Sequence, residues 1–298
     1  MEVVLRPGRI GESVVMLDVM GWGHVRTNSS LLLLGRRLAV VEPGCKGSAE
    51  VIVREAKSLG LRLDDFHYLF VTHRHLDHLA GAPVLLRFMQ NARVAGHRYA
   101  IATLRDPSKI NAAARQVFGG YVEPTDRVDD EGRLIVVDEG DSMELGQGLE
   151  LEVVLTPGHT SDHLSFYEKR NRLMFTGDSA GILAGETLTV IPTTFPPSFK
   201  YNRYLKSVER MLEYKPKIVV FAHFGAVRGD DAYRILERSI EVLEDWKGLA
   251  EESEDENVLA RRLKEKYGAG LSPFPLEVKE YMFSLLAAGL RRGLTAGE

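Results

Sequence analysis

The chain has 298 residues and a formal net charge of -4, with 44% hydrophobic and 27% charged residues. This composition is that of a globular protein with a sizeable core, and it disfavours a nucleic-acid-binding protein, which more often has a basic surplus. The longest apolar run, at residues 31–34, is far shorter than the roughly 18 residues of a membrane span. We therefore expect neither a membrane segment nor a nucleic-acid partner.

Short apolar runs separated by turns fill the first part of the chain. Residues 30–35 and 38–42 predict a hairpin. A helix with one apolar face is expected over residues 50–59, and Gly60 is placed to end it. Further strands are expected at residues 66–72, 149–155, 164–167, 173–176 and 217–222, with residues 164–176 forming a hairpin.

The pattern becomes helical towards the end of the chain. An amphipathic helix is expected around residues 204–212, and apolar residues recur at helical spacing from about Asp230 onwards. An acidic stretch at residues 251–256 is expected to separate two of these helices, and a last helix is expected around residues 278–286. Residues 98–120 include an Ala-rich helical run and are a candidate flap beside a site.

The N-terminus and the single cysteine bear on location and redox chemistry. The chain opens with Met-Glu and has no basic region followed by an apolar stretch, so we expect no signal peptide and a cytoplasmic protein. Cys45 stands alone, which excludes an intrachain disulfide and a thiolate metal cluster. We interpret Cys45 as a loop residue rather than a reactive thiol. Scarce Asn and Gln favour a thermophilic source.

The strongest chemical signal lies directly after the strand expected at residues 66–72. The segment Thr72-His73-Arg74-His75-Leu76-Asp77-His78 places four ligand-type side chains within six positions. In extended backbone, residues two apart point to the same side, so His73 and His75 can converge on one metal ion. Asp77 and His78 then enter the next helix and can face a second ion.

Three more candidates follow apolar strands in the same manner. His159 comes after Thr156-Pro157-Gly158, Asp178 after Phe175-Thr176-Gly177, and His223 after Phe221-Ala222. Loops at strand ends can gather distant residues into one pocket. We therefore expect these three residues to join the four of the first segment.

The ligand set itself indicates the kind of site. Imidazole and carboxylate without thiolate suit zinc, iron or manganese and an open site rather than a closed structural one. Five histidines and two aspartates exceed what one tetrahedral ion needs. Two divalent ions that share a carboxylate would account for the number, with zinc as the first expectation and iron or manganese as alternatives.

These motifs, taken in chain order, resemble those of the metallo-β-lactamase superfamily over roughly residues 1–228. The resemblance implies an α/β fold, a four-layer αβ/βα sandwich with metal ions at one edge. It implies a catalytic domain over residues 1–228, to which we add a helical region over residues 229–298 packed on the core.

The resemblance also implies the role of each ligand. One ion would be held by His73, His75 and His159, and the other by Asp77, His78 and His223. Asp178 would bridge the two ions. A hydroxide between the ions would be the nucleophile, and Asp77 would orient it or move its proton to the leaving group.

Within the superfamily the sequence looks most similar to glyoxalase II-like and lactonase-like hydrolases. We expect hydrolysis of an ester-type bond in a small molecule: a thioester, a lactone, a carboxylic ester or a phosphoester. The early loop departs from the family, because it reads Val41-Glu42-Pro43-Gly44 where many members have Asp-Thr-Gly or Asp-Ala-Gly. We expect Glu42 to alter the support of the site without touching a ligand.

One alternative function remains open, and three others are disfavoured, among them a non-catalytic binding protein, because all seven ligand positions are filled. A mononuclear iron persulfide dioxygenase would use the same motif. A di-iron oxidoreductase is disfavoured, because such members carry Glu at the position of His75 and an appended flavin domain. A nucleic-acid-processing enzyme would need further motifs and a basic surface, neither of which is found. The oligomeric state is open between a monomer and a homodimer.

Several further residues have expected roles outside the ligand set. His163 is either a partner of the ligands or a solvated residue at the start of a strand. His24, His67 and His97 are expected to be structural. The Pro- and aromatic-rich segment with Phe195, Phe199 and Tyr201 is a candidate wall of a substrate pocket for acyl or aryl groups.

Overall fold

The computed structural model describes residues 2–120, 122–185, 189–271, 274 and 276–295 of the chain. Its internal contacts divide the chain into two compact units. The amino-terminal unit consists of Arg6–Leu155 and Leu164–Leu173. The carboxy-terminal unit consists of Met1–Leu5, Thr156–His163 and Met174–Glu298.

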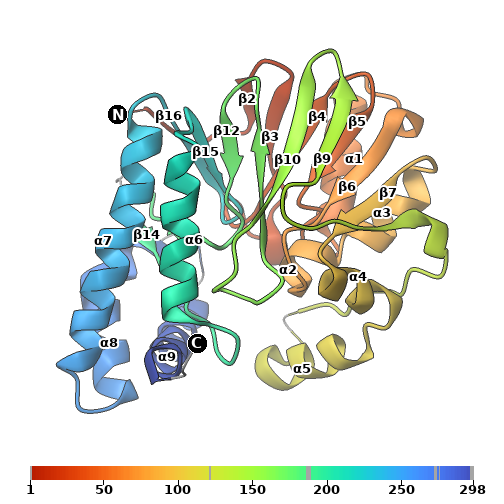
Figure 1. Ribbon diagram of the computed structural model, residues 1–298. Helices are drawn as coiled ribbons and strands as arrows, with labels where there is room; N and C mark the ends of the chain where they lie inside the picture. Colours follow the sequence, from red (N-terminus) through yellow and green to blue (C-terminus); the bar gives the residue numbers. More distant parts are fainter. Residues whose placement is uncertain (1, 121, 186–188, 272–273, 275, 296–298) are drawn as a thin grey trace. The chain divides into compact units, whose positions relative to one another are not determined.

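The amino-terminal unit contains a sheet of the order β2-β3-β4-β5-β6-β7-β8 (Figure 1). Its first four strands are antiparallel neighbours, whereas β5 to β8 run parallel to one another. The strands are β2 (Gly8–Gly11), β3 (Val14–Asp18), β4 (Ser29–Leu34), β5 (Leu38–Val41), β6 (Phe66–Phe70), β7 (Arg93–Gly96) and β8 (Leu134–Val136).

Helices make the crossovers that parallel strands require. They are α1 (Ser48–Ser58), α2 (Leu76–Leu79), α3 (Ala82–Phe88), α4 (Arg98–Arg105) and α5 (Ser108–Phe118). Side chains of α1, α3 and α4, such as Ile52, Leu85 and Ile101, share one buried cluster with Val40 and Leu69 of the sheet. Because β5 and β6 are parallel, their carboxyl ends lie at the same edge of the sheet, and the residues that follow each strand are brought together there.

The amino-terminal unit also contains an antiparallel group formed by β9 (Ser142–Gly146), β10 (Leu149–Leu155) and β11 (Leu164–Glu168). In β10 the hydrophobic residues alternate with Glu150 and Glu152, and the hydrophobic ones are the more buried. This period of two is the pattern of a strand with one buried face. β10 leads directly to the loop of His159.

The carboxy-terminal unit is built on β16 (Gly225–Arg228), which pairs antiparallel with both β1 (Glu2–Val4) and β15 (Ile218–Phe221). The chain enters this unit along β12 (Leu173–Phe175), the other neighbour of β15. A small ladder joins β13 (Ile182–Leu183) and β14 (Val190–Ile191). The helices are α6 (Tyr201–Glu213), α7 (Asp231–Glu251), α8 (Glu256–Tyr267) and α9 (Leu276–Thr295). This unit also contains the 3-10 turn η4 (Gly268–Leu271), and the amino-terminal unit contains the 3-10 turns η1 (Gly21–Gly23), η2 (Leu63–Asp65) and η3 (Glu131–Arg133).

The helical pattern predicted for the end of the chain is confirmed. α7 ends within the acidic stretch, and α8 begins after Asp255, whose carboxylate accepts hydrogen bonds from the N–H groups of Asn257 and Val258. That N-cap explains why the acidic residues separate two helices instead of joining them. The contacts group these helices with residues 174–228, and the division into a catalytic domain and a helical region stays a prediction.

Most other elements agree with the sequence, within one to three residues at their ends. The hairpin of residues 30–42 is confirmed as β4 and β5. The strand expected at residues 66–72 is shorter, because β6 ends at Phe70 and the chain then turns towards the histidine segment. Residues 98–120 form α4 and α5, and Ala114 of α5 packs against Leu76 and Ala80.

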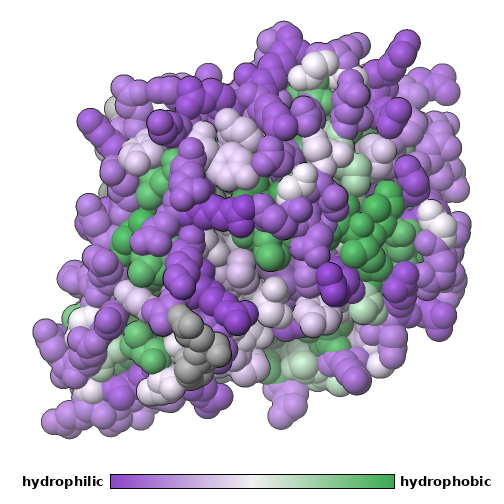
Figure 2. Space-filling view, viewed as in Figure 1, coloured by the Kyte–Doolittle hydropathy of each residue, from purple (hydrophilic) through white to green (hydrophobic). Residues whose placement is uncertain are grey.

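Among the described residues, no helix combines the length and the apolar character that crossing a membrane would demand. The face of the molecule seen in Figure 2 is mostly hydrophilic, and its hydrophobic residues lie in small separate groups. Scattered apolar residues of this kind are normal on a protein surface.

Candidate metal centre

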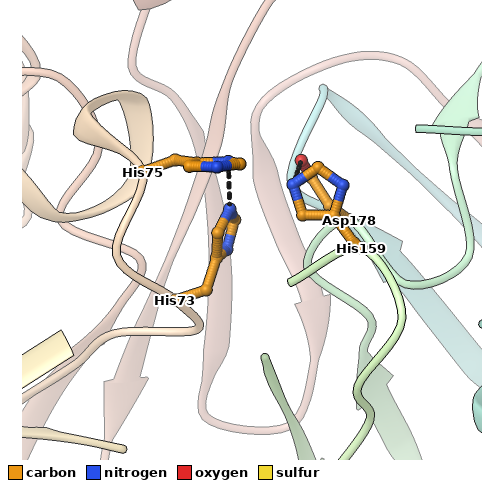
Figure 3. A group of neighbouring side chains, drawn as sticks. All are labelled: His73, His75, His159 and Asp178. Atoms are coloured by element: carbon orange, nitrogen blue, oxygen red, sulfur yellow. Dashed lines mark hydrogen bonds and ion pairs between the residues drawn. The ribbon is translucent and has the colours of Figure 1, made fainter. Parts of the chain in front are cut away.

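The histidine segment of the amino-terminal unit follows β6 at the carboxyl edge of the parallel strands. The Nε2 atom of His73 lies 2.9 Å from Nδ1 of His75 (Figure 3). His75 has extended backbone and directly precedes α2, so Asp77 and His78 fall in the first turns of that helix. The Nε2 atom of His78 lies 3.2 Å from Oδ2 of Asp77. The segment therefore brings its four candidate ligands together as two adjacent pairs.

A buried carboxylate supports this segment from the neighbouring strand. Glu42 follows β5 directly, and its side chain is fully buried. Its Oε1 atom lies 2.5 Å from Nδ1 of His78 and accepts a hydrogen bond of 3.1 Å from the hydroxyl of Thr72. The expectation that Glu42 touches no ligand is therefore wrong. The side chain reaches His78 because β5 and β6 are parallel and end at the same edge.

Glu42 also fixes which ring nitrogens carry protons. Since the Thr72 hydroxyl donates to Glu42, it can accept a proton from Nδ1 of His73, 3.0 Å away. The carboxylate likewise accepts a hydrogen bond from Nδ1–H of His78. In both neutral rings the lone pair then lies on Nε2. Hydrogen bonds of this kind orient histidines that bind metal ions.

The turn between β3 and β4 is tied to the same segment. Asn28 donates from Nδ2 to the backbone carbonyl of Asp77 at 3.0 Å. The turn contains three non-glycine residues with positive φ: Met20, Trp22 and Arg26. Asp18 accepts bonds from the N–H groups of Met20 and Arg26 and so holds this unusual backbone.

A cavity of about 300 Å³ lies beside this turn in the amino-terminal unit. Its apolar lining includes Met20, Trp22, Leu76 and Val122, and Cys45 also faces it. Burial raises the pKa of the Cys45 thiol to about 12, and the nearby negative charge of Asp77 acts in the same direction. A thiol held in its neutral form is a poor nucleophile, which supports the interpretation of Cys45 as a loop residue.

In the carboxy-terminal unit, Asp178 is placed among two histidines. Its Oδ2 atom lies 3.2 Å from Nε2 of His159, and its Oδ1 atom lies 3.3 Å from Nε2 of His223. All three side chains are buried. One carboxylate therefore presents a different oxygen to each histidine.

Backbone and hydroxyl groups hold these residues in place. The carbonyl of Thr193 can only accept, so Nδ1–H of His159 donates to it at 2.8 Å and the lone pair of the neutral ring lies on Nε2. The hydroxyls of Thr193 and Tyr204 donate to the carbonyl of Asp178, at 2.6 and 3.1 Å. Burial raises the pKa of Tyr204 far above its usual range, so its hydroxyl remains a donor.

His163 is a partner of the ligands and not a solvated residue. It is fully buried, and its Nε2 atom accepts a hydrogen bond of 2.9 Å from the backbone N–H of Asp178. Its Nδ1 atom lies 2.9 Å from the hydroxyl of Thr156 and 2.8 Å from that of Ser179. Of the histidines expected to be structural, His97 caps α4 by accepting the N–H of Tyr99.

The loop of His159 depends on a close approach to helix α6. Gly158 has φ 137, and a Cβ atom there would overlap the backbone of Tyr204. The carbonyl of Gly158 accepts the N–H of Lys200 at 2.8 Å, and the hydroxyl of Ser207 donates to the carbonyl of Pro157 at 2.7 Å. Only glycine fits this backbone and this spacing.

The aromatic segment before α6 has a different role from the one expected. Phe199 and Tyr201 are buried at 2% and 6% exposure, so they belong to the core and do not line an open pocket. Phe195 is half-buried, and its ring lies edge-on to His159 with centroids 6.2 Å apart. Of the three residues, Phe195 alone stays a candidate for substrate contact.

Each unit thus contributes several candidate metal ligands that lie close to one another. The potential ligand atoms lie within 4.8 Å of one another in the pairs His73 with His75, Asp77 with His78, and His159 with Asp178. The sequence did not indicate the contact of Glu42 with His78, or the contacts that Thr193 and Tyr204 make with His159 and Asp178. Glu42 was visible only as a departure from the family motif, and no sequence signal points to Thr193 or Tyr204.

Residues 22–223 match the model of the family described as "Metallo-beta-lactamase superfamily". The match spans more than half of the chain, and the protein belongs to this superfamily. The relatives that follow are proteins to which the chain is similar.

One is the metallo-beta-lactamase fold-containing protein ST1585 of Sulfurisphaera tokodaii, which is 36% identical over 171 residues, 55% of this chain and 63% of that protein. Another is a hydroxyacylglutathione hydrolase of Methylobacterium nodulans, 32% identical over 131 residues, 44% of this chain and 39% of that protein. The chain thus spans less than two thirds of the length of these relatives.

Solved structures show the same fold. The crystal structure of ST1585, an archaeal superfamily protein from Sulfolobus tokodaii, has a TM-score of 0.66 at 23% identity and covers 97% of both chains. The superfamily protein TTHA1429 of Thermus thermophilus has a TM-score of 0.62 at 19% identity and covers 99% of this chain and 94% of that one. The predicted α/β metallo-β-lactamase fold with C-terminal helices is confirmed.

Proposed function

We propose that the protein is a metal-dependent hydrolase that cleaves an ester-type bond in a small molecule. Two divalent ions would be held, one by His73, His75 and His159 and one by Asp77, His78 and His223, and Asp178 would supply an oxygen to each. The observation that carries it is the division of the Asp178 carboxylate, whose Oδ2 faces His159 and whose Oδ1 faces His223. A carboxylate that serves two ions needs this arrangement.

The residues fit divalent ions chemically. Imidazole nitrogens and carboxylate oxygens suit zinc, iron and manganese, and burying a carboxylate such as Asp178 is costly unless a positive charge compensates it. The Nε2 atoms of His73, His78 and His159 are left as acceptors by the hydrogen bonds at their Nδ1 atoms. Zinc is our first expectation, and iron and manganese are the alternatives.

A bound divalent ion lowers the pKa of a coordinated water towards neutrality and polarises the substrate oxygen. We assign Asp77 the task of orienting the attacking water and passing its proton to the leaving group. Its side chain retains 18% exposure, and Asn28 and Glu42 hold the backbone and the neighbouring ring around it. No serine or cysteine nucleophile is needed, and the raised pKa of Cys45 makes that thiol unsuitable as one.

The names of the relatives and the lining of the cavity guide the choice of compounds to test first. Several relatives are named hydroxyacylglutathione hydrolase, an enzyme of thioester cleavage. The cavity beside α2 combines apolar side chains, such as those of Trp22 and Leu76, with the polar ones of Lys46, Ser48 and Glu123. Thioesters, lactones and carboxylic esters with apolar acyl groups are therefore the first compounds to test, followed by phosphoesters.

The test begins with elemental analysis of protein purified without added metal, followed by hydrolysis assays on that panel. We expect about two ions of zinc, iron or manganese per chain and turnover of at least one ester class. Asp77→Asn is expected to lower kcat by roughly 100-fold or more, because the loss of a general acid–base group typically costs that much.

Two results would contradict the proposal. Protein that binds two ions and hydrolyses none of the panel would remove the ester-type reaction. Protein that binds a single iron, even after supplementation, would favour the mononuclear dioxygenase, and oxygen consumption with a persulfide would then be measured.

A further inference from the structure

Helix α9 packs very closely on the segment of residues 193–199. The hydroxyl of Thr194 donates to the carbonyl of Leu286 at 2.7 Å, and both residues are fully buried. A Cβ atom on Gly289 would overlap the carbonyl of Thr194, and one on Gly293 would overlap the ring of Phe199. Leu286, Gly289 and Gly293 are three and four residues apart, so they lie on one face of the helix.

The same segment holds two candidate ligands. Thr193 precedes Thr194, and its carbonyl accepts Nδ1–H of His159 at 2.8 Å. Its hydroxyl donates to the carbonyl of Asp178 at 2.6 Å. The position of Thr193 therefore sets both the ring of His159 and the backbone of Asp178. Because Thr194 is bonded to α9, a shift of the helix would move Thr193.

A second contact joins the end of the chain to the third candidate ligand. Phe274 lies between η4 and α9, and only 4% of it is exposed. Its ring is tilted by 60° against that of His223, with centroids 6.3 Å apart. In η4, Gly270 approaches Ala184 so closely that a Cβ atom would overlap that residue.

We propose that η4, Phe274 and α9 form a positioning element of the metal centre, with Thr194 and Gly289 as positioning residues. This inference rests on the proposed metal-binding function. The carbonyl of Leu286 in α9 fixes Thr194, and Thr193 is the preceding residue of the chain. The carbonyl of Thr193 binds Nδ1–H of His159, which leaves Nε2 as the atom that would bind the ion. Removal of the Thr194 hydroxyl should therefore weaken metal binding although that hydroxyl touches no ligand.

The experiment compares Thr194→Val with the conservative variant Thr194→Ser. A matched control is Thr103→Val, which removes an exposed hydroxyl that donates to the helix carbonyl of Tyr99 at 2.9 Å. Three quantities are measured for each protein: the zinc Kd by competition with a chelator, the visible spectrum of the cobalt-substituted protein, and the Tm of the metal-free protein.

We expect Thr194→Val to raise the zinc Kd by roughly tenfold or more, the range typical of groups that orient metal ligands. Its cobalt spectrum should change, whereas Thr194→Ser and Thr103→Val should keep the wild-type Kd and spectrum. A lower Tm for Thr194→Val with a Kd within about twofold of wild type and an unchanged spectrum would overturn the proposal, because that result describes a purely structural bond.

A second pair of variants tests the close approach of the helix. Gly289→Ala places a Cβ atom against the carbonyl of Thr194, whereas Gly248→Ala in α7 meets no atom within 4 Å. We expect Gly289→Ala to weaken zinc binding and Gly248→Ala to leave it unchanged. If Gly289→Ala does not fold, the Thr194 variants decide. Wild-type protein that binds no metal would overturn the proposed function and this inference together, whereas equal binding by wild type and Thr194→Val would overturn the inference alone.

Discussion

The two units supply candidate ligands in different ways. In the amino-terminal unit, His73, His75, Asp77 and His78 come from six consecutive positions, and the local backbone brings them together. In the carboxy-terminal unit, three candidate ligands come from three separate loops and meet because β12, β15 and the buried segment around Thr193 hold them. The arrangement of the first group depends chiefly on its local sequence and backbone, whereas that of the second depends on the packing of distant segments. Substitutions far from the ligands should therefore act more strongly on the second group.

The largest effect on metal binding is expected at Asp178, whose carboxylate faces both His159 and His223. Asp178→Asn keeps the shape but removes the charge that faces His159 and His223. We expect the affinity for metal to fall by roughly 100-fold or more, beyond the 10–100-fold typical of groups that only orient ligands. Elemental analysis after dialysis measures the loss.

A surface carboxylate of the same unit provides the control. Asp230 is exposed and pairs with Lys217 at 3.0 Å. Asp230→Asn should keep the wild-type metal content. Two ions retained by Asp178→Asn after dialysis would show that this carboxylate does not bridge them.

A smaller effect on metal binding is expected at Glu42, whose carboxylate supports the histidine segment of residues 73–78. Glu42→Gln removes the charge that accepts Nδ1–H of His78 and the hydroxyl proton of Thr72. We expect the zinc Kd to rise by roughly 10–100-fold, as measured by chelator competition.

Glu168→Gln is the matched control, because Glu168 is also fully buried in the amino-terminal unit. Its carboxylate accepts the N–H groups of Arg170 and Asn171 instead of a candidate ligand. We expect it to destabilise the fold by roughly 1–3 kcal/mol and to leave the Kd unchanged. Equal Kd values for Glu42→Gln and wild type would mean that the histidine segment needs no support from β5.

The smallest effect on the metal centre is expected at Cys45, which lines the cavity near α2. Because the pKa of the folded thiol is raised from 9.0 to about 12, the thiolate fraction at pH 8 should be roughly 1000-fold lower than in the unfolded chain. Alkylation should therefore be slow in the native protein and fast in denaturant, as followed by mass spectrometry.

The raised pKa of Cys45 also predicts how the stability of the fold changes with pH. The folded state retains the thiol proton more strongly than the unfolded state, so the contribution to stability is complete below about pH 9 and is lost between about pH 9 and 12. Cys45→Ser should remove that loss and leave metal content unchanged. Rapid alkylation of the native protein at pH 8 would disprove the raised pKa.

The sequence predicts the candidate ligands at residues 73–78 more fully than the residues that hold the ligands in place. The spacing of His73 to His78 after an apolar run is visible directly, and the helices after residue 230 follow from their apolar period. The contact of Glu42 with His78 joins residues 36 positions apart and depends on the parallel pairing of β5 and β6. Thr193 holds His159 through its carbonyl group, which every residue carries, so no residue type could have indicated that contact. Phe199 looked available for substrate until the packing of α9 accounted for it.

The close approach at Gly158 also bears on protein engineering. Because the loop of His159 fits against the backbone of Tyr204 and is bonded to Lys200, loop and helix start form one transferable module. A graft of the loop alone onto another scaffold would lack the start of helix α6, against which the loop packs. A successful transplant would need to carry residues 156–160 together with residues 200–207, and a library that randomises position 158 would return glycine.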